Sequence, residues 1–285
     1  MAITSSRWRA ASAFIAAGAA VAAVLASAVP AGASTGTAEI SPEQAGYTAT
    51  GAQFKFINAS VFLRQPGQYS SEVASFGHSV QLWSSGRVIT LGVTASTSGG
   101  GYTTYATIYD RRTHRVIAAN PDGQTCDRYG FCTPGPATLD PGLPVAMVIS
   151  YAPASGHLLM EEFYSDSEDN ETNFVSDYTA AGQSFTQARV GIDFGSTPWD
   201  GSYSHTPPAQ YTKAAAYTGA SLITYSGHQS SLWSWWLHHK LLANTERQSG
   251  SDWVAFPADL TNGGANFQTW FVPQSSQGQT QPVLH

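Results

Sequence analysis

The sequence predicts an all-β protein built as an antiparallel two-sheet β-sandwich. Short runs of β-branched and aromatic residues recur roughly every 10 to 15 positions, and clusters of Gly, Pro, Asn and Ser separate them. This spacing is typical of a sandwich or barrel. Charged residues make up only 11% of the 285-residue chain, well below the roughly 25% of an ordinary globular domain. No segment shows convincing helical periodicity.

The expected strands follow one another along most of the chain. The clearest pair is a hairpin that turns at Ser85-Gly86, and a second pair turns at residues 153–156, where Pro and Gly interrupt the apolar pattern. Residues 111–114 form the turn between two further strands. The predicted strands are 54–63, 79–84, 87–94, 102–110, 145–151, 157–164, 188–194, 220–225, 232–243, 253–258 and 267–272.

Residues 1–33 have the three-part layout of a secretory signal peptide. A short basic start precedes a long Ala-rich apolar run, and Ala31-Gly32-Ala33 is a small-residue cleavage site. The rest is expected to comprise a polar N-terminal tail (34–46), one β-sandwich domain (47–273) and a flexible C-terminal tail (274–285). An Ala-rich signal and a Cys-poor exported domain suggest a bacterial protein that is secreted and works outside the cell.

The charge balance limits the classes of partner. Cleavage after Ala33 leaves 11 basic and 19 acidic residues, a net charge of −8, so no basic field attracts phosphates. We therefore expect no nucleic-acid partner and, after signal removal, no membrane partner. The remaining apolar stretches are far shorter than the roughly 20 residues that span a bilayer. A soluble monomer is expected.

Two cysteines, Cys126 and Cys132, stand six residues apart in a chain that is predicted to be exported. A local disulfide is the simplest interpretation. Such a short loop loses little unfolded-state entropy on closure, so the bond would mainly shape this loop. A metal site would need more Cys or His nearby, and no cofactor is expected.

Several aromatic side chains are candidates for ligand contacts. If residues 232–243 form a strand, Trp236 and His238 share its outward face, because side chains alternate between faces. An indole beside an imidazole can stack a sugar ring or hold an extended chain. Trp83 and Trp199 stand at strand ends and complete the predicted binding set. The alternative is that Trp236 covers a rim or packs under a loop, since large aromatics are most often core residues.

The only dense acidic run is residues 161–171. Glu162 with Asp166, or Asp166 with Glu168, could form the carboxylate pair of a glycosidase. Asp166, Glu168 and Asn170 could instead be oxygen ligands of calcium. The run leaves its strand near residue 164 and is predicted to become a polar loop, so a solvated loop without either function is the third interpretation.

The order of segments resembles the eqolisins, the glutamic peptidases. The matching runs span roughly residues 47–225, and they are 54–63, 88–93, 105–110, 141–151 with Ser155-Gly156, and 187–194. The resemblance implies a concanavalin A-like sandwich of two long antiparallel sheets.

The resemblance also implies a catalytic pair. The family uses a glutamine in the strand that matches residues 88–93 and a glutamate just after the alanine that matches Ala188. That pair activates a water and stabilises the tetrahedral intermediate at acid pH. In this sequence the matching positions hold Thr90 and Arg189. Arginine is permanently cationic and cannot shuttle a proton, so the resemblance implies the fold without the pair.

Two classes of function follow, and the sequence does not decide whether the chain is an enzyme. The leading hypothesis is a secreted β-sandwich that binds an extracellular polymer, glycan or peptide without glutamic-peptidase catalysis. The rival is a secreted acid-active hydrolase, either an endopeptidase with a relocated pair or a glycosidase. Its candidate catalytic residues are Gln81, Glu161, Glu162 and Asp193. A surface protein whose sandwich is only a scaffold is a third option.

Overall fold

The computed structural model describes residues 39–41, 44–63, 76–95, 101–165, 171–194, 215–231, 238–244, 253–257 and 259–273. Over these ranges the chain consists of β-strands and one 3₁₀ turn, η2 (Asn262–Gly264), so the all-β prediction is confirmed. Within the same ranges, no helix is long and apolar enough to cross a membrane.

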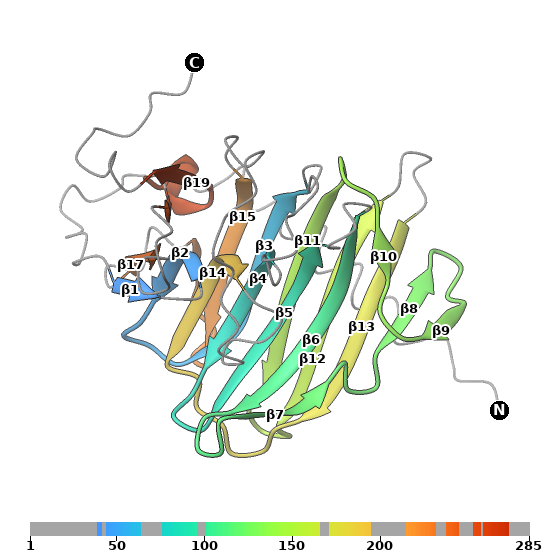
Figure 1. The fold of residues 1–285 in the computed structure, drawn as a ribbon. Helices are drawn as coiled ribbons and strands as arrows, with labels where there is room; N and C mark the ends of the chain where they lie inside the picture. Colours follow the sequence, from blue (N-terminus) through green and yellow to red (C-terminus); the bar gives the residue numbers. More distant parts are fainter. Residues whose placement is uncertain are drawn as a thin grey trace. The chain divides into compact units, whose positions relative to one another are not determined.

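The strands form two layers that face each other (Figure 1). Sheet A contains, in spatial order, β2 (Gln44–Ala49), β14 (Gln187–Phe194), β4 (Phe76–Trp83), β5 (Arg87–Ala95), β6 (Tyr102–Asp110) and β7 (Arg115–Ala119). The short β10 (Thr138–Leu139) also pairs with β6. Sheet B contains β8 (Gln124–Asp127), β13 (Glu171–Thr179), β12 (His157–Ser165), β11 (Pro144–Ala152), β3 (Phe54–Phe62) and β15 (Ala215–Thr224).

Hydrogen bonding also joins the two sheets along one edge. The pairing continues from β15 through β19 (Phe267–Pro273), β18 (Trp253–Pro257) and β17 (His238–Asn244) into β2. The remaining strands are short: β1 (Glu39–Ser41) pairs with β17, β16 (Gln229–Ser231) with β15, and β9 (Cys132–Pro134) with β8. Of all these pairings, only that of β1 with β17 is parallel, which confirms the antiparallel two-sheet sandwich.

Strict alternation along the strands of sheet A builds the core. Tyr47, Val190, Val80, Leu91 and Ala106 stand directly opposite one another on five neighbouring strands. All five are buried in the main hydrophobic cluster. Because the side-chain period of a strand is two residues, the residues between these positions project from the other face of the sheet.

Most of the predicted strands are confirmed, including the hairpin at Ser85-Gly86 and the pairing of residues 145–151 with 157–164. Strand β1 and the start of β2 fall within residues 34–46, where the sequence predicts a polar N-terminal tail. Strand β2 is difficult to recognise in the sequence because it is rich in small residues. Gly46 faces Gly191 across the pair, and a Cβ atom on Gly46 would lie 1.9 Å from the carbonyl oxygen of Val190. The two backbones therefore approach too closely for a larger residue.

The acidic run leaves its strand where the sequence predicts, because β12 ends at Ser165. Residues 166–170 lie outside the described residues, so their prediction as a polar loop stays a prediction. The sequence does not predict β13, which begins at Glu171. The sequence of β13 is polar, which hides its strand character. Ser176 is nevertheless buried, because its hydroxyl donates a 2.6 Å hydrogen bond to the backbone carbonyl of Pro121.

Two ionisable side chains lie in the core. Nδ1 of His78 is 2.7 Å from the hydroxyl of Tyr217, and burial lowers the pKa of this imidazole to about 3. Glu162 is fully buried between its cross-strand neighbours Met147 and Phe174. Neither of its carboxyl oxygens has a hydrogen-bond partner among the described residues, and burial raises its pKa well above the ordinary value of 4.5.

The two groups affect the pH dependence of stability in opposite directions. The folded chain keeps the proton on Glu162, so this contribution is present below about pH 4.5 and is lost as the pH rises. The folded chain keeps His78 neutral, so its contribution is present above pH 6.5 and is lost as the pH falls towards 3. The combined contribution of Glu162 and His78 to stability should therefore be largest between about pH 4.5 and pH 6.5.

We expect the substitution Glu162→Met to stabilise the fold at neutral pH. Burial raises the pKa of this carboxyl well above 4.5, so holding it in the core costs more at pH 7 than at pH 4, and the thioether removes this cost. Urea denaturation should show a clearly larger gain in the free energy of unfolding at pH 7 than at pH 4, where the substitution removes only the unpaired carboxyl oxygens. The exposed Glu171→Gln is the control and should alter neither value. An equal gain at both pH values would contradict this account.

Candidate functional site

A row of polar side chains crosses the face of sheet A that is opposite to the core row. Thr48 faces Arg189, which faces Gln81, followed by Thr90 and Thr107 on the next two strands. We call these five residues the polar row. Each is only 0 to 7% exposed. Five side chains with hydrogen-bonding groups are thus held in line across five strands.

Trp83 fixes the centre of the polar row. Its indole Nε1 donates a 2.7 Å hydrogen bond to Oε1 of Gln81. The guanidinium carbon of Arg189 lies 4.1 Å from the centre of the indole ring, and that of Arg111 lies 5.3 Å from it. These cation–π contacts hold both arginines over the indole. Trp83 is a predicted ligand contact, but it is only 6% exposed and offers no open stacking face.

The rows on either side of the polar row differ in character. On one side Trp83, Val88 and Tyr109 face each other and form a small apolar cluster with Val116. On the other side the facing residues are Gly46, Gly191, Ser79 and Gly92, which carry little or no side chain, followed by Tyr105 on β6. The polar row therefore has apolar packing on one flank, while on the other flank the side chains are small except for Tyr105.

Two hydroxyls in the polar row have unused hydrogen-bonding capacity. Oγ1 of Thr90 and Oγ1 of Thr107 are buried and have no hydrogen-bond partner among the described residues. By contrast, Oγ1 of Thr48 accepts a 2.9 Å hydrogen bond from Nε2 of Gln187. Buried polar atoms are nearly always paired, because an unpaired group costs about 1 to 3 kcal/mol. The two threonines face each other, so they offer adjacent bonding positions to a ligand.

The polar row can bind but cannot exchange protons. Arg189 carries its only full charge, while Gln81 and the threonines are neutral. None of these groups both gives and takes a proton in the accessible pH range, which general acid–base catalysis requires. Asp193, a predicted catalytic residue, pairs with Gly77 four positions further along β14, and its side chain lies outside the described residues.

The other predicted carboxylates are in sheet B, away from Gln81. Glu162 points into the core and not into a cleft, so its prediction as a cleft carboxylate is wrong. Glu161 projects from the opposite face of β12 and is half-buried. Burial, and then the nearby Asp177, raise the pKa of Glu161 to about 7. Nε2 of His157 lies 2.7 Å from Oδ1 of Asp177, so this group forms a separate surface cluster.

Several predicted positions fall outside the described residues, namely Trp199, Trp236, Asp166, Glu168 and Asn170. His238 begins β17, where it pairs with Ala49, but its side chain is not described. In the described part of the chain, no group of three or more His, Cys, Asp or Glu could hold a metal ion.

The sequence missed two members of the polar row, Thr48 and Thr107. The sequence predicts no strand before residue 54, so it gives no register for Thr48, which lies in β2. Thr107 is an ordinary strand residue, and only the register of β5 with β6 places it opposite Thr90. A strand-by-strand alignment of polar positions is the signal that could have found both.

A small cavity lies beyond Trp83, at the end of the β4–β5 hairpin. Its volume is about 230 Å³, and Ser84, Arg87, Asp110, Arg112 and Gln183 are among its lining residues. Nη1 of Arg87 lies 3.6 Å from Oδ2 of Asp110. The cavity is smaller than the roughly 300 Å³ at which ligand pockets usually begin, so the polar row is the stronger candidate.

Comparisons with known proteins identify the fold. The chain resembles the crystal structure of scytalido-glutamic peptidase with a transition-state analogue inhibitor, with a TM-score of 0.53, 12% identity, and coverage of 81% of this chain and 98% of the other. A structure of SCP-B, from the eqolisin family of peptidases, gives a TM-score of 0.46 at the same identity and coverage. Neither protein-family profiles nor curated sequences give a match. The chain therefore has the two-sheet sandwich fold of the eqolisins.

We expect Thr90→Val and Thr107→Val to leave stability unchanged or to raise it by up to about 1 kcal/mol, because each removes an unpaired buried hydroxyl. Thr104→Val is the matched control in the same sheet, since Oγ1 of Thr104 accepts a 2.8 Å hydrogen bond from the backbone nitrogen of Ala137. That substitution should cost about 1 to 3 kcal/mol. Denaturant unfolding measures all three. Equal losses would show that Thr90 and Thr107 are paired after all.

Proposed function

We propose that this protein is a secreted, monomeric, non-hydrolytic binding protein that holds an extended extracellular polymer, a glycan in the first instance, across the polar row. The observation that carries this proposal is the facing pair of buried, unpartnered hydroxyls on Thr90 and Thr107. They stand in line with Gln81 and Arg189, on the face where the resemblance placed the catalytic pair of the peptidases.

The dimensions and chemistry of the polar row suit a polymer. It crosses five strands, which are spaced about 4.8 Å apart, and therefore spans about 19 Å. Sugar hydroxyls both donate and accept hydrogen bonds, and the threonines, Gln81 and Arg189 together offer both functions. Because the row is almost wholly buried, a polymer reaches it only if the groups that cover it move. Association should then be slower than for a preformed groove.

The residue at position 189 argues against peptidase chemistry. A glutamate there could take a proton from water, whereas the guanidinium of Arg189 stays protonated. Its stacking on Trp83 further commits it to a structural or ligand-contacting role. The disulfide between Cys126 and Cys132 supports secretion, because such bonds persist mainly in oxidising compartments.

An acid-active hydrolase is the second candidate. The fold shared with scytalido-glutamic peptidase favours it, and Gln81 lies directly opposite Arg189 in the register. Glu161, whose pKa is about 7, is the described carboxyl best suited to general acid catalysis. It belongs to the other sheet, however, and no described residue pairs it with Gln81.

We expect the purified protein to bind at least one soluble glycan, from β-glucan, xylan and galactomannan, and to cleave none between pH 3 and 8. Thr90→Val should weaken this binding by about fivefold, since one hydrogen bond contributes roughly 1 kcal/mol. Calorimetric titration measures the affinity, and a reducing-end assay measures cleavage. Thr113→Val, on an exposed turn, is the control and should bind as the parent does.

Cleavage of a substrate, or failure to bind any glycan, would contradict this proposal. New reducing ends, or peptides released from denatured casein with an acid optimum, would establish the hydrolase. Loss of that activity in Gln81→Ala or Glu161→Gln would then locate the relocated pair. Absence of binding to every glycan in the panel would remove the glycan from the proposal.

A further inference from the structure

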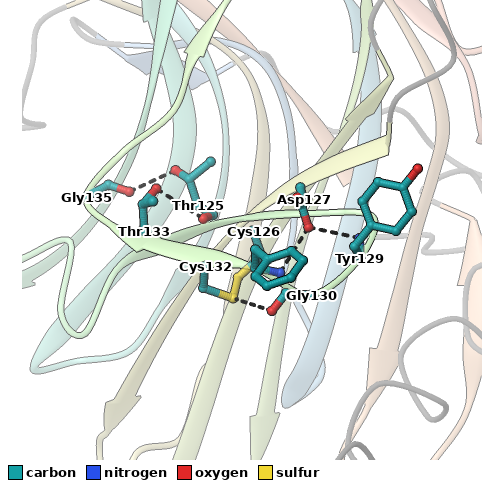
Figure 2. The surroundings of a disulfide bond; sticks show 9 residues. Thr125, Cys126, Asp127, Tyr129, Gly130, Cys132, Thr133 and Gly135 are labelled. Carbon is teal, nitrogen blue, oxygen red and sulfur yellow. Dashed lines mark hydrogen bonds between the residues drawn. A yellow bond between two sulfur atoms is a disulfide. The ribbon is translucent and has the colours of Figure 1, made fainter.

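The disulfide-closed hairpin at the edge of sheet B presents two exposed aromatic rings. The bond between Cys126 and Cys132 links β8 to β9, as the sequence predicts. Between the cysteines, Tyr129 is 71% exposed and Phe131 is 76% exposed. Figure 2 shows the ring of Tyr129 pointing away from the hairpin. We call Arg128, Tyr129 and Phe131 the aromatic tip.

Polar contacts hold the loop without covering the rings. Oδ1 of Asp127 accepts hydrogen bonds of 2.9 Å from the backbone nitrogens of both Tyr129 and Phe131 (Figure 2). The backbone nitrogen of Asp127 donates to the carbonyl of Phe131 at 3.0 Å, and that of Gly130 donates to the carbonyl of Asp127 at 3.0 Å. Gly130 has a φ of +83°, which few other residues adopt. The loop is therefore ordered before any ligand arrives.

Such exposure is unusual elsewhere in the described chain. The other exposed large hydrophobic residues there are Phe62 and Ile117, which are 47% and 43% exposed. They lie on separate strands, β3 and β7, whereas the tip places two aromatic rings two residues apart. Exposed aromatics add little to folding, and a rigid loop that keeps them exposed is characteristic of a binding site.

Arg128 adds polar groups to the tip. Its guanidinium carbon lies 4.8 Å from the centre of the Tyr129 ring, and its Nη2 donates a 2.7 Å hydrogen bond to the Tyr129 hydroxyl. The positive charge is balanced within the loop by the carboxylate of Asp127. The tip is thus a neutral surface that combines aromatic faces with hydrogen-bond donors, the combination that recognises sugar rings.

We infer that the aromatic tip is a second binding site, which stacks the ring faces of an insoluble polysaccharide. The small contact area of the two rings favours this ligand over a protein partner. Two aromatic side chains bury at most about 500 Å², below the roughly 800 Å² per partner of a stable protein interface. Each ring is wide enough for one sugar. A loop of zero net charge on an acidic chain has no attraction for anionic lipids.

The choice of a glycan rests on the proposed function, but the site rests on its own geometry in sheet B. The polar row would bind a single polymer chain along sheet A. The tip would instead adhere to a surface of packed chains, where several sugar faces are exposed together.

The experiment measures depletion of the purified protein from suspensions of cellulose, chitin and insoluble β-glucan. Tyr129→Ser with Phe131→Ser should lower retention on at least one of them by about tenfold or more. The control carries Phe62→Ser and Ile117→Ser, which remove the other exposed large hydrophobic side chains of the described residues, and should be retained like the parent. Because the tip rings are exposed, their loss should leave the melting temperature unchanged.

Other outcomes overturn the inference. Equal retention of the parent and the tip variant would do so, as would retention of the parent by none of the three solids. A dimer that the tip variant abolishes, or binding to phosphatidylcholine vesicles alone, would assign the tip to a second copy or to lipid. If Thr90→Val binds soluble glycan more weakly while the tip variant is retained on the solids like the parent, this inference is overturned and the proposed function stands. If the tip variant loses retention while Thr90→Val binds soluble glycan like the parent, only the proposed function is overturned.

Discussion

The antiparallel register of β2, β14, β4, β5 and β6 is the constraint on which the rest of the structure depends. It sets the core row, including Val80 and Val190, opposite one another on one face. At the positions next to these, the same register places Gln81 opposite Arg189 and Thr90 opposite Thr107 on the other face of the sheet. A slip of one residue would turn Arg189 towards the core and move the aliphatic side chains to the other face. The same register therefore determines both the stability of the fold and the geometry of the site.

The same register places the core residues and the site residues on opposite faces of sheet A. The core row is apolar, and the sandwich fold is shared with scytalido-glutamic peptidase at 12% identity. The other face carries Arg189, stacked on Trp83, where the resemblance expects a glutamate. The proposed site therefore binds its ligand by hydrogen bonds and transfers no proton. Function in this fold depends on the outward residues, not on the sandwich.

The sequence predicted the fold better than the site. Long alternating strands such as residues 54–63 and 102–110 were found because their period is clear, whereas β2 was missed because Gly46 and its neighbours give little pattern. The disulfide was predicted correctly from the spacing of two cysteines in a chain that is expected to be exported. The acidic run misled because only the structure shows Glu162 facing the core. Which polar residues align across strands depends on register, a long-range property that local periodicity does not contain.

The most direct test of the central claim, that the polar row binds a polymer without cleaving it, is a nuclear magnetic resonance titration of the labelled protein with a soluble glycan oligomer. The account predicts that the largest shifts fall on the amides and methyl groups of Thr90, Thr107 and their facing strands, and that the oligomer is recovered intact. Shifts confined to sheet B, or a cleaved oligomer, would contradict it.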